Sequence, residues 1–137
     1  MKCYLVALFL FGLSVSGFAQ TQCAAFPCVV ASVALTNQTT SVSQVPVYTP
    51  AQSGMFRISY YEESAPIVGS SWIFTWNWTD DTTTRSYGPF ALSRGLYFNA
   101  GVPGMWVTAG QPITYTVTKG RGGLGSYNLY ATVEQIQ

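Results

Sequence analysis

The sequence predicts an all-β protein: a two-sheet antiparallel sandwich of about eight strands, wound as a jelly roll. After the first nineteen residues, no window places apolar side chains at helical spacing, whereas several segments alternate apolar and polar residues with a period of two. Short strands separated by turn residues recur along the chain, as in sandwiches and barrels. Long connections after the first strand favour jelly-roll winding over simple hairpins.

The N-terminal residues predict a secretory signal peptide. A basic residue precedes an apolar run (residues 5–13) that is shorter than the about 20 residues of a membrane-spanning helix. Small residues then follow at the positions that a signal peptidase needs. We therefore expect a signal peptide (residues 1–19), an N-terminal segment (residues 20–28) and one β-sandwich domain (residues 29–137), in a protein secreted to the extracellular space or the periplasm.

The first three predicted strands differ in how clearly they alternate. Residues 29–37 place every second side chain on one face: Val29, Ala31, Val33 and Leu35. Residues 45–48 form a short strand, which Pro46 confines to a sheet edge because proline cannot donate a ladder hydrogen bond. Residues 55–63 alternate most regularly and direct one set of side chains to the core: Phe56, Ile58 and Tyr60.

The next predicted strand, residues 71–79, carries four aromatic side chains on one face: Trp72, Phe74, Trp76 and Trp78. Such a row can fill the space between two sheets, because aromatic residues bury large areas. If it is exposed, it can instead stack on sugar rings. The opposite face is mostly polar, which favours burial of the last three aromatics, whereas Trp72 lies beside a loop and is expected to be exposed.

The C-terminal half contains two weak and two strong strand patterns. Residues 85–92 and 95–99 are weak strands, residues 101–104 are predicted as a loop, and residues 106–107 as a short edge piece. The strong patterns direct two sets of side chains inward: Ile113, Tyr115 and Val117 from residues 113–119, and Tyr127, Leu129, Ala131 and Val133 from residues 127–136.

Tyrosines on polar faces are the predicted binding residues. Alternation directs Tyr61 and Tyr130 outward, and Tyr87 and Tyr97 are candidates of the same kind. Amphipathic rings on a neutral surface are typical anchors of protein interfaces, although scattered surface tyrosines are also common. Together with Trp72, these residues form the predicted binding set.

The composition argues against several classes of function. The six Lys and Arg residues become five when Lys2 of the predicted signal peptide is removed, and these balance five Asp and Glu residues. Charged residues make up 8% of the chain, against about 25% in average proteins. Such a chain offers no basic surface for nucleic acid and no polybasic segment for an anionic membrane. With 48% hydrophobic residues, the chain is expected to fold into a charge-poor domain whose surface suits a partner.

The sequence contains no histidine and no catalytic motif. Its acids form two doublets, Glu62-Glu63 and Asp80-Asp81, which could serve as a glycosidase pair or a calcium site. A hairpin between strands 55–63 and 71–79 would place the doublets at opposite ends, so we interpret them as solvated strand ends and turn residues. We predict no enzyme activity, no catalytic residue, no metal site and no cofactor.

Cys23 and Cys28 are the two cysteines that follow the predicted signal peptide. In an oxidising compartment, a pair this close in sequence is most simply a local disulfide. It would close a small loop around Pro27 and stabilise the fold by roughly 2 kcal/mol. Two thiols without a histidine or a nearby acid do not complete a zinc shell.

The stretch from Tyr48 to Tyr61 (YTPAQSGMFRISYY) combines a proline turn, a glycine, an aromatic residue and a strand that ends in paired aromatics. It resembles the corresponding stretch of C1q/TNF-like jelly-roll head domains, and that of small phage-like and bacterial secreted structural proteins. Residues 78–80 and 127–134 are similar to the second group as well. The resemblance implies assembly, as in a trimer, or adhesion rather than catalysis, in a chain without the collagen-like stalk usual in C1q-type proteins.

These observations predict a secreted, non-catalytic structural or adhesive subunit. It would associate with copies of itself, as a homo-oligomer such as a trimer or a filament, or bind an extracellular protein or glycan through neutral, tyrosine-rich sheet surface. The alternative is a carbohydrate-binding module that uses exposed aromatic residues near Trp72.

Overall fold

The computed structural model describes residues 25–65, 71–93, 97–120, 122 and 125–137. These residues form β1 (Cys28–Gln38), β2 (Val42–Tyr48), β3 (Gly54–Ser64), β4 (Ser71–Asp80), β5 (Thr83–Ser93), β6 (Tyr97–Val107), β7 (Ile113–Lys119) and β8 (Tyr127–Gln135). This part of the chain has no helix long and apolar enough to cross a membrane. The predicted signal peptide and Cys23 lie outside the described residues, so that peptide and the disulfide stay predictions.

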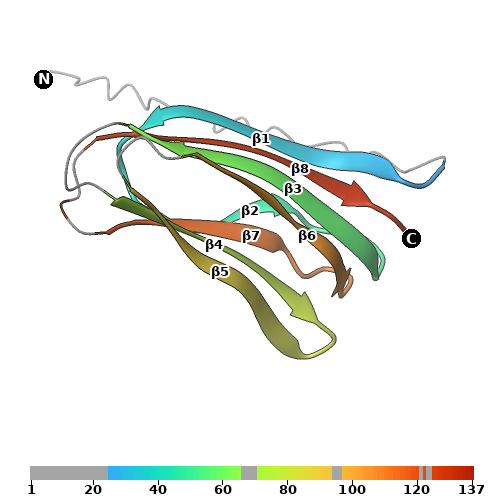
Figure 1. The fold of residues 1–137 in the computed structure, drawn as a ribbon. Helices are drawn as coiled ribbons and strands as arrows, with labels where there is room; N and C mark the ends of the chain where they lie inside the picture. Colours follow the sequence, from blue (N-terminus) through green and yellow to red (C-terminus); the bar gives the residue numbers. More distant parts are fainter. Residues whose placement is uncertain (1–24, 66–70, 94–96, 121, 123–124) are drawn as a thin grey trace, which may run out of the picture.

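The strands form two antiparallel four-stranded sheets that stack as the layers of a sandwich (Figure 1). Sheet A has the order β1-β8-β3-β6, and sheet B has the order β2-β7-β4-β5. The strands pair as β1 with β8, β2 with β7, β3 with β6 and β4 with β5, so the second half of the chain runs back along the first. This pairing is the winding of a jelly roll and confirms the predicted fold class.

The three most regular strands direct the predicted side chains to the core. Because successive side chains of a strand point to opposite faces, β3, β7 and β8 each bury one alternate set. The buried residues are Phe56, Ile58, Tyr60, Ile113, Tyr115, Val117, Tyr127, Leu129, Ala131 and Val133. The two sheets meet through aromatic contacts such as that between Tyr60 and Trp76, whose ring centroids lie 5.7 Å apart.

The aromatic row of β4 belongs to this core. Phe74 and Trp76 are buried as predicted, and Trp78 packs half-buried against the same core. The predicted exposure of Trp72 is wrong, because its side chain is 0% exposed. The Tyr127 ring covers it with centroids 4.7 Å apart, and Lys119 Nζ lies 5.7 Å from the indole centroid. The core therefore extends to the end of the sandwich where β4 begins.

Two local predictions are corrected by the structure. Residues 101–104, predicted as a loop, lie inside β6, an edge strand of sheet A. An edge strand tolerates proline and glycine because one of its sides forms no ladder. In β1, Val29 is 51% exposed and Val30 packs against the core instead, since a register shift between Val29 and Ala31 interrupts the alternation.

Gly101 lies where β6 approaches β3 closely. A Cβ atom at this position would lie 2.5 Å from the backbone oxygen of Ile58. We expect Gly101→Ala to lower the free energy of unfolding, measured by urea denaturation, by roughly 1–3 kcal/mol, as in an overpacked core. Gly104→Ala is the control in the same strand, because its Cβ would meet only the flexible Met55 side chain at 3.4 Å. Equal losses in the two variants would contradict this account.

Candidate functional site

The candidate site is a neutral band on the outer face of sheet A, made of two rows of uncharged residues across all four strands. One row is Ala34, Tyr130, Tyr61 and Asn99, and the next is Ser32, Thr132, Ser59 and Gly101. The strand register places the members of a row side by side, because residues paired across neighbouring strands share a face. The register thus gathers residues from β1, β3, β6 and β8 into one surface.

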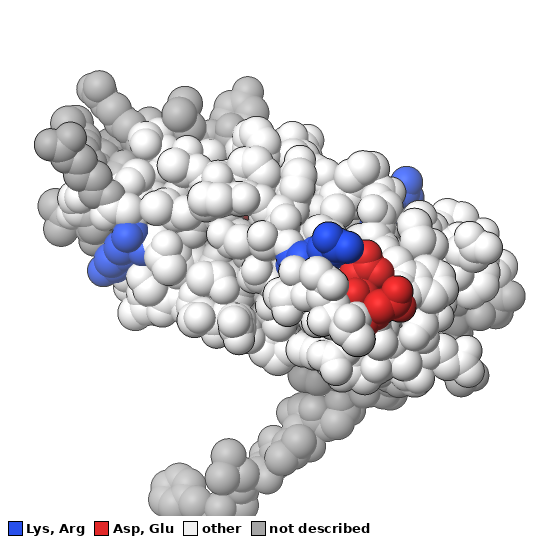
Figure 2. Space-filling view, turned by 90° about the horizontal axis from the view of Figure 1, so that it is seen from below, with Lys and Arg blue, Asp and Glu red and all other residues white. Residues whose placement is uncertain are grey.

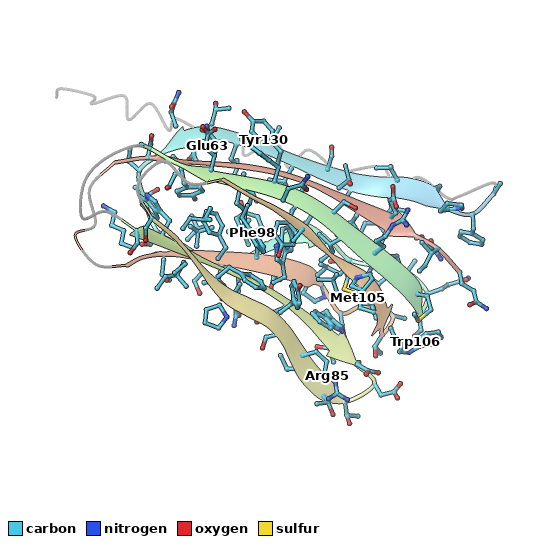
Figure 3. The ribbon with its side chains drawn as sticks, viewed as in Figure 1. Glu63, Arg85, Phe98, Met105, Trp106 and Tyr130 are labelled. Atoms are coloured by element: carbon cyan, nitrogen blue, oxygen red, sulfur yellow. The ribbon has the colours of Figure 1, made fainter. Side chains whose placement is uncertain are left out.

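Tyr61 and Tyr130 lie at the centre of the neutral band. β3 and β8 place them directly opposite each other, with ring centroids 6.2 Å apart and ring planes at 45°. Tyr130 is 39% exposed and points away from the sandwich, whereas Phe98 lies in its interior (Figure 3). A shallow, open depression around the pair is lined by Ser32, Ser59, Asn99 and Thr132. The surface thus presents aromatic rings among small polar groups.

Charged groups next to the neutral band are partnered. On one side, Arg57 and Glu134 form an ion pair in which Arg57 Nε lies 2.6 Å from Glu134 Oε2. On the other side, Asn128 Nδ2 donates a 2.9 Å hydrogen bond to Glu63 Oε2. A partner that covers the neutral band alone would therefore leave these charged groups in place and avoid the cost of burying an unpaired charge.

The remaining predicted binding residues do not join this surface. Tyr87 is paired with Trp76, a core residue, so its side chain lies on the inner face of β5 and the predicted outward direction is wrong. It packs on Phe90 with ring centroids 4.9 Å apart. Trp72 is enclosed in the core, as described above. Tyr97 begins β6, and its side chain lies outside the described part of the structure.

The outer face of sheet B is a second surface with little charge. Figure 2 views the molecule from this side and shows a few basic and acidic side chains among large uncharged areas. In its centre, Thr75 of β4 faces Thr116 of β7, and Asn77 faces Thr114. Such cross-strand pairs of small polar residues stabilise sheets by themselves. Because these central pairs include no aromatic residue, the candidate site is placed on sheet A.

The acidic doublets form no common site. β3 and β4 lie in different sheets, so the predicted hairpin between them is wrong. Asp80 and Asp81 lie at the β4–β5 turn as predicted, where Asp80 Oδ2 is 3.4 Å from Arg85 Nε. Glu63 lies at the opposite end, where β3 runs beside Asn128. Within the described ranges, no group of three or more potential metal ligands comes together.

Glu62 departs most from the sequence prediction. We expected a solvated strand end, but its side chain is 0% exposed and lies inside the sandwich. The signal was present in the sequence, because Glu62 follows Ile58 and Tyr60 at the same period of two. Neither carboxylate oxygen has a hydrogen-bond partner in the described part of the chain.

Burial raises the pKa of Glu62 to about 8, because the charged carboxylate loses its hydration. The nearby Trp76 side chain lowers the pKa and partly offsets this effect. Desolvation and, next, the Glu62 charge raise the pKa of the Tyr60 hydroxyl. Since the Glu62 side chain is closed to solvent, it cannot contact a substrate. We expect its ionisation to change the free energy of unfolding instead.

No protein-family model matches the chain, and no curated protein matches it. The resemblance to C1q/TNF-like heads and to small bacterial or phage-like structural proteins therefore stays a prediction. Among the described residues, the neutral band is the surface that combines aromatic rings with a lack of unpaired charge.

Proposed function

We propose that the chain is a secreted, non-catalytic structural or adhesive subunit that associates through the neutral band, with copies of itself or with an extracellular partner. The observation that carries this proposal is the Tyr61–Tyr130 pair at the centre of an uncharged surface spanning four strands. Covering apolar surface contributes about 25 cal/mol per Å². Tyrosine is enriched in the centres of interfaces, where it combines a large ring with a hydroxyl that can hydrogen-bond.

The placement of the carboxylates supports a role without catalysis. Hydrolysis of a glycosidic bond ordinarily needs two carboxyl groups on either side of one substrate. Glu62 is enclosed in the core, while Asp80 and Glu134 are engaged by arginines. Glu63 accepts a hydrogen bond from Asn128. Asp81 lies beside Asp80 in the β4–β5 turn, so the five acids lie in the core, at this turn and on the outer face of sheet A rather than on either side of one open site.

The alternative, a carbohydrate-binding module, rests on exposed aromatic residues near Trp72. That indole is enclosed by Tyr127 and so offers no face to a sugar ring. The Tyr61 and Tyr130 rings are tilted by 45° rather than coplanar, which does not give the flat platform that a row of stacked sugars would need. The geometry therefore favours a protein contact.

Size-exclusion chromatography with light scattering tests self-association. We expect the wild-type chain to exceed the monomer mass at high micromolar concentration, and Tyr61→Ser/Tyr130→Ser to weaken association by about tenfold or more, an effect typical of aromatic anchors. Trp106→Ser is the matched control, because it removes another exposed ring of the same face that lies outside the neutral band. A monomeric wild type that also binds no extracellular partner, or equal losses in both variants, would contradict the proposal.

A further inference from the structure

The two sheets have four edge strands: β1 and β6 in sheet A, and β2 and β5 in sheet B. An edge strand presents unpaired N–H and C=O groups to which another chain can add, and proteins protect such edges with proline, charge, bulges or short length. Three of these edges carry protection: β2 has seven residues with Pro46, β5 contains Arg85 and Pro89, and β6 contains Pro103.

β1 has neither the proline, the charge nor the short length that protects the other edges, and its bulges lie near its ends. Its eleven residues include no proline, no glycine and no charged side chain, and they are rich in the β-branched residues that favour strands. No strand of the described residues pairs with its outer side. Its register shifts lie toward its two ends, between Val29 and Ala31 and between Leu35 and Gln38, so residues 31–35 form a regular ladder with β8. This central segment is a regular, uncharged template for one more strand.

We propose that residues 31–35 of β1 pair with the same residues of a second copy, antiparallel across a two-fold axis, so that sheet A continues from one molecule into the next. The absence of charge favours this occupant, because two identical strands can lie side by side without repulsion. A two-fold arrangement makes such a contact self-complementary and closed. The inference rests on the proposed function in taking a second copy as the partner, and it adds a contact at the edge of sheet A to the contact made by its face.

The neutral band supports the same geometry. It reaches the edge of sheet A through Ser32 and Ala34 of β1, which forms the outer margin of the upper layer in Figure 1. In a pair centred on Val33, Ser32 of one copy faces Ala34 of the other on the outer face. Edge pairing would therefore join the neutral bands of two copies into one continuous surface with two tyrosine pairs.

Charge placed on β1 tests the edge contact. Ser32→Lys/Ala34→Lys puts like charges opposite each other on both sides of the two-fold axis, and we expect the dimer dissociation constant, measured by sedimentation equilibrium, to rise about tenfold or more. Mixing this variant with Ser32→Glu/Ala34→Glu should restore the dimer. Thr132→Lys is the control for the face of the sheet, because it adds one charge to the row of Ser32, one strand further from the edge. It should leave the edge contact intact.

Hydrogen exchange of the wild-type chain at low and high concentration gives a second readout. We expect protection of β1 to rise with concentration while that of β6 does not change. If Thr132→Lys weakens the dimer as much as the β1 variant does and β1 protection stays constant, the contact is made by the face, and the edge inference fails while the proposed function stands. If β1 is already strongly protected at the low concentration at which the chain is monomeric, another segment of the same chain covers the edge, which also contradicts the inference. A monomeric wild type overturns self-association itself, by edge or by face.

Discussion

Raising the pH from about 5 to about 8 is expected to lower the free energy of unfolding by roughly 1.4 kcal/mol per pH unit, a total of a few kcal/mol. The folded state holds the Glu62 proton up to a pKa of about 8, whereas the ordinary pKa of a glutamate carboxyl group is 4.5. The stabilising effect of this proton is complete below the unfolded pKa and is lost as the pH rises through the folded pKa. Urea denaturation across this pH range measures the slope.

Glu62→Gln is the variant that assigns the slope. The amide has a similar size but does not ionise, so the free energy of unfolding should become nearly independent of pH between about 5 and 8. The chain contains no histidine, the residue that ordinarily titrates in this range, which simplifies the assignment. Glu63→Gln, at the neighbouring position on the outer face, should keep the wild-type slope. A slope that persists in Glu62→Gln would refute the role of this carboxyl group.

Trp72→Ala is expected to lower the free energy of unfolding by about 3–5 kcal/mol, the cost of emptying a large, fully buried aromatic site. Such a loss is a large part of the about 5–15 kcal/mol that stabilises a typical domain. Thermal or urea unfolding followed by circular dichroism measures it. If the alanine variant is unfolded from the start, Trp72→Phe keeps part of the ring and should show a smaller loss that can be measured.

The control for this prediction is Trp106→Ala, because Trp106 is 41% exposed on β6. We expect it to lose roughly 1 kcal/mol or less, as substitutions at exposed sites usually do. Similar losses at Trp72 and Trp106 would mean that the indole of Trp72 contributes little packing. That result would contradict its burial and agree with the exposed position expected from the sequence.

Much of the fold follows from alternation alone. The residues of β3, β7 and β8 that the sequence directs inward are buried, because a period of two on a sheet with one covered face leaves little choice. Glu62 follows the same rule as Ile58 and Tyr60. Treating it as a solvated acid gave weight to residue type over position, and the periodicity was the stronger signal.

Other features depend on contacts that a single sequence does not encode locally. The burial of Trp72 needs Tyr127, which is far away along the chain and packs against it across the two sheets. β6 contains Gly101 and Pro103, which are typical of a loop but are accommodated at a sheet edge. The neutral band likewise arises only when the register places Tyr61 beside Tyr130. The outward direction of its two tyrosines could be predicted, but not that they lie side by side.

The pairing of β1 with β8 has a consequence for how the molecule is made. Of the eight strands in the described residues, the first to leave the ribosome finds its partner only when the last one has emerged, so sheet A closes only after all of its strands have been made. Chains that depend on such distant pairings fold slowly. Until then the least protected strand is without its native neighbour, and a chaperone that shields it would reduce premature aggregation.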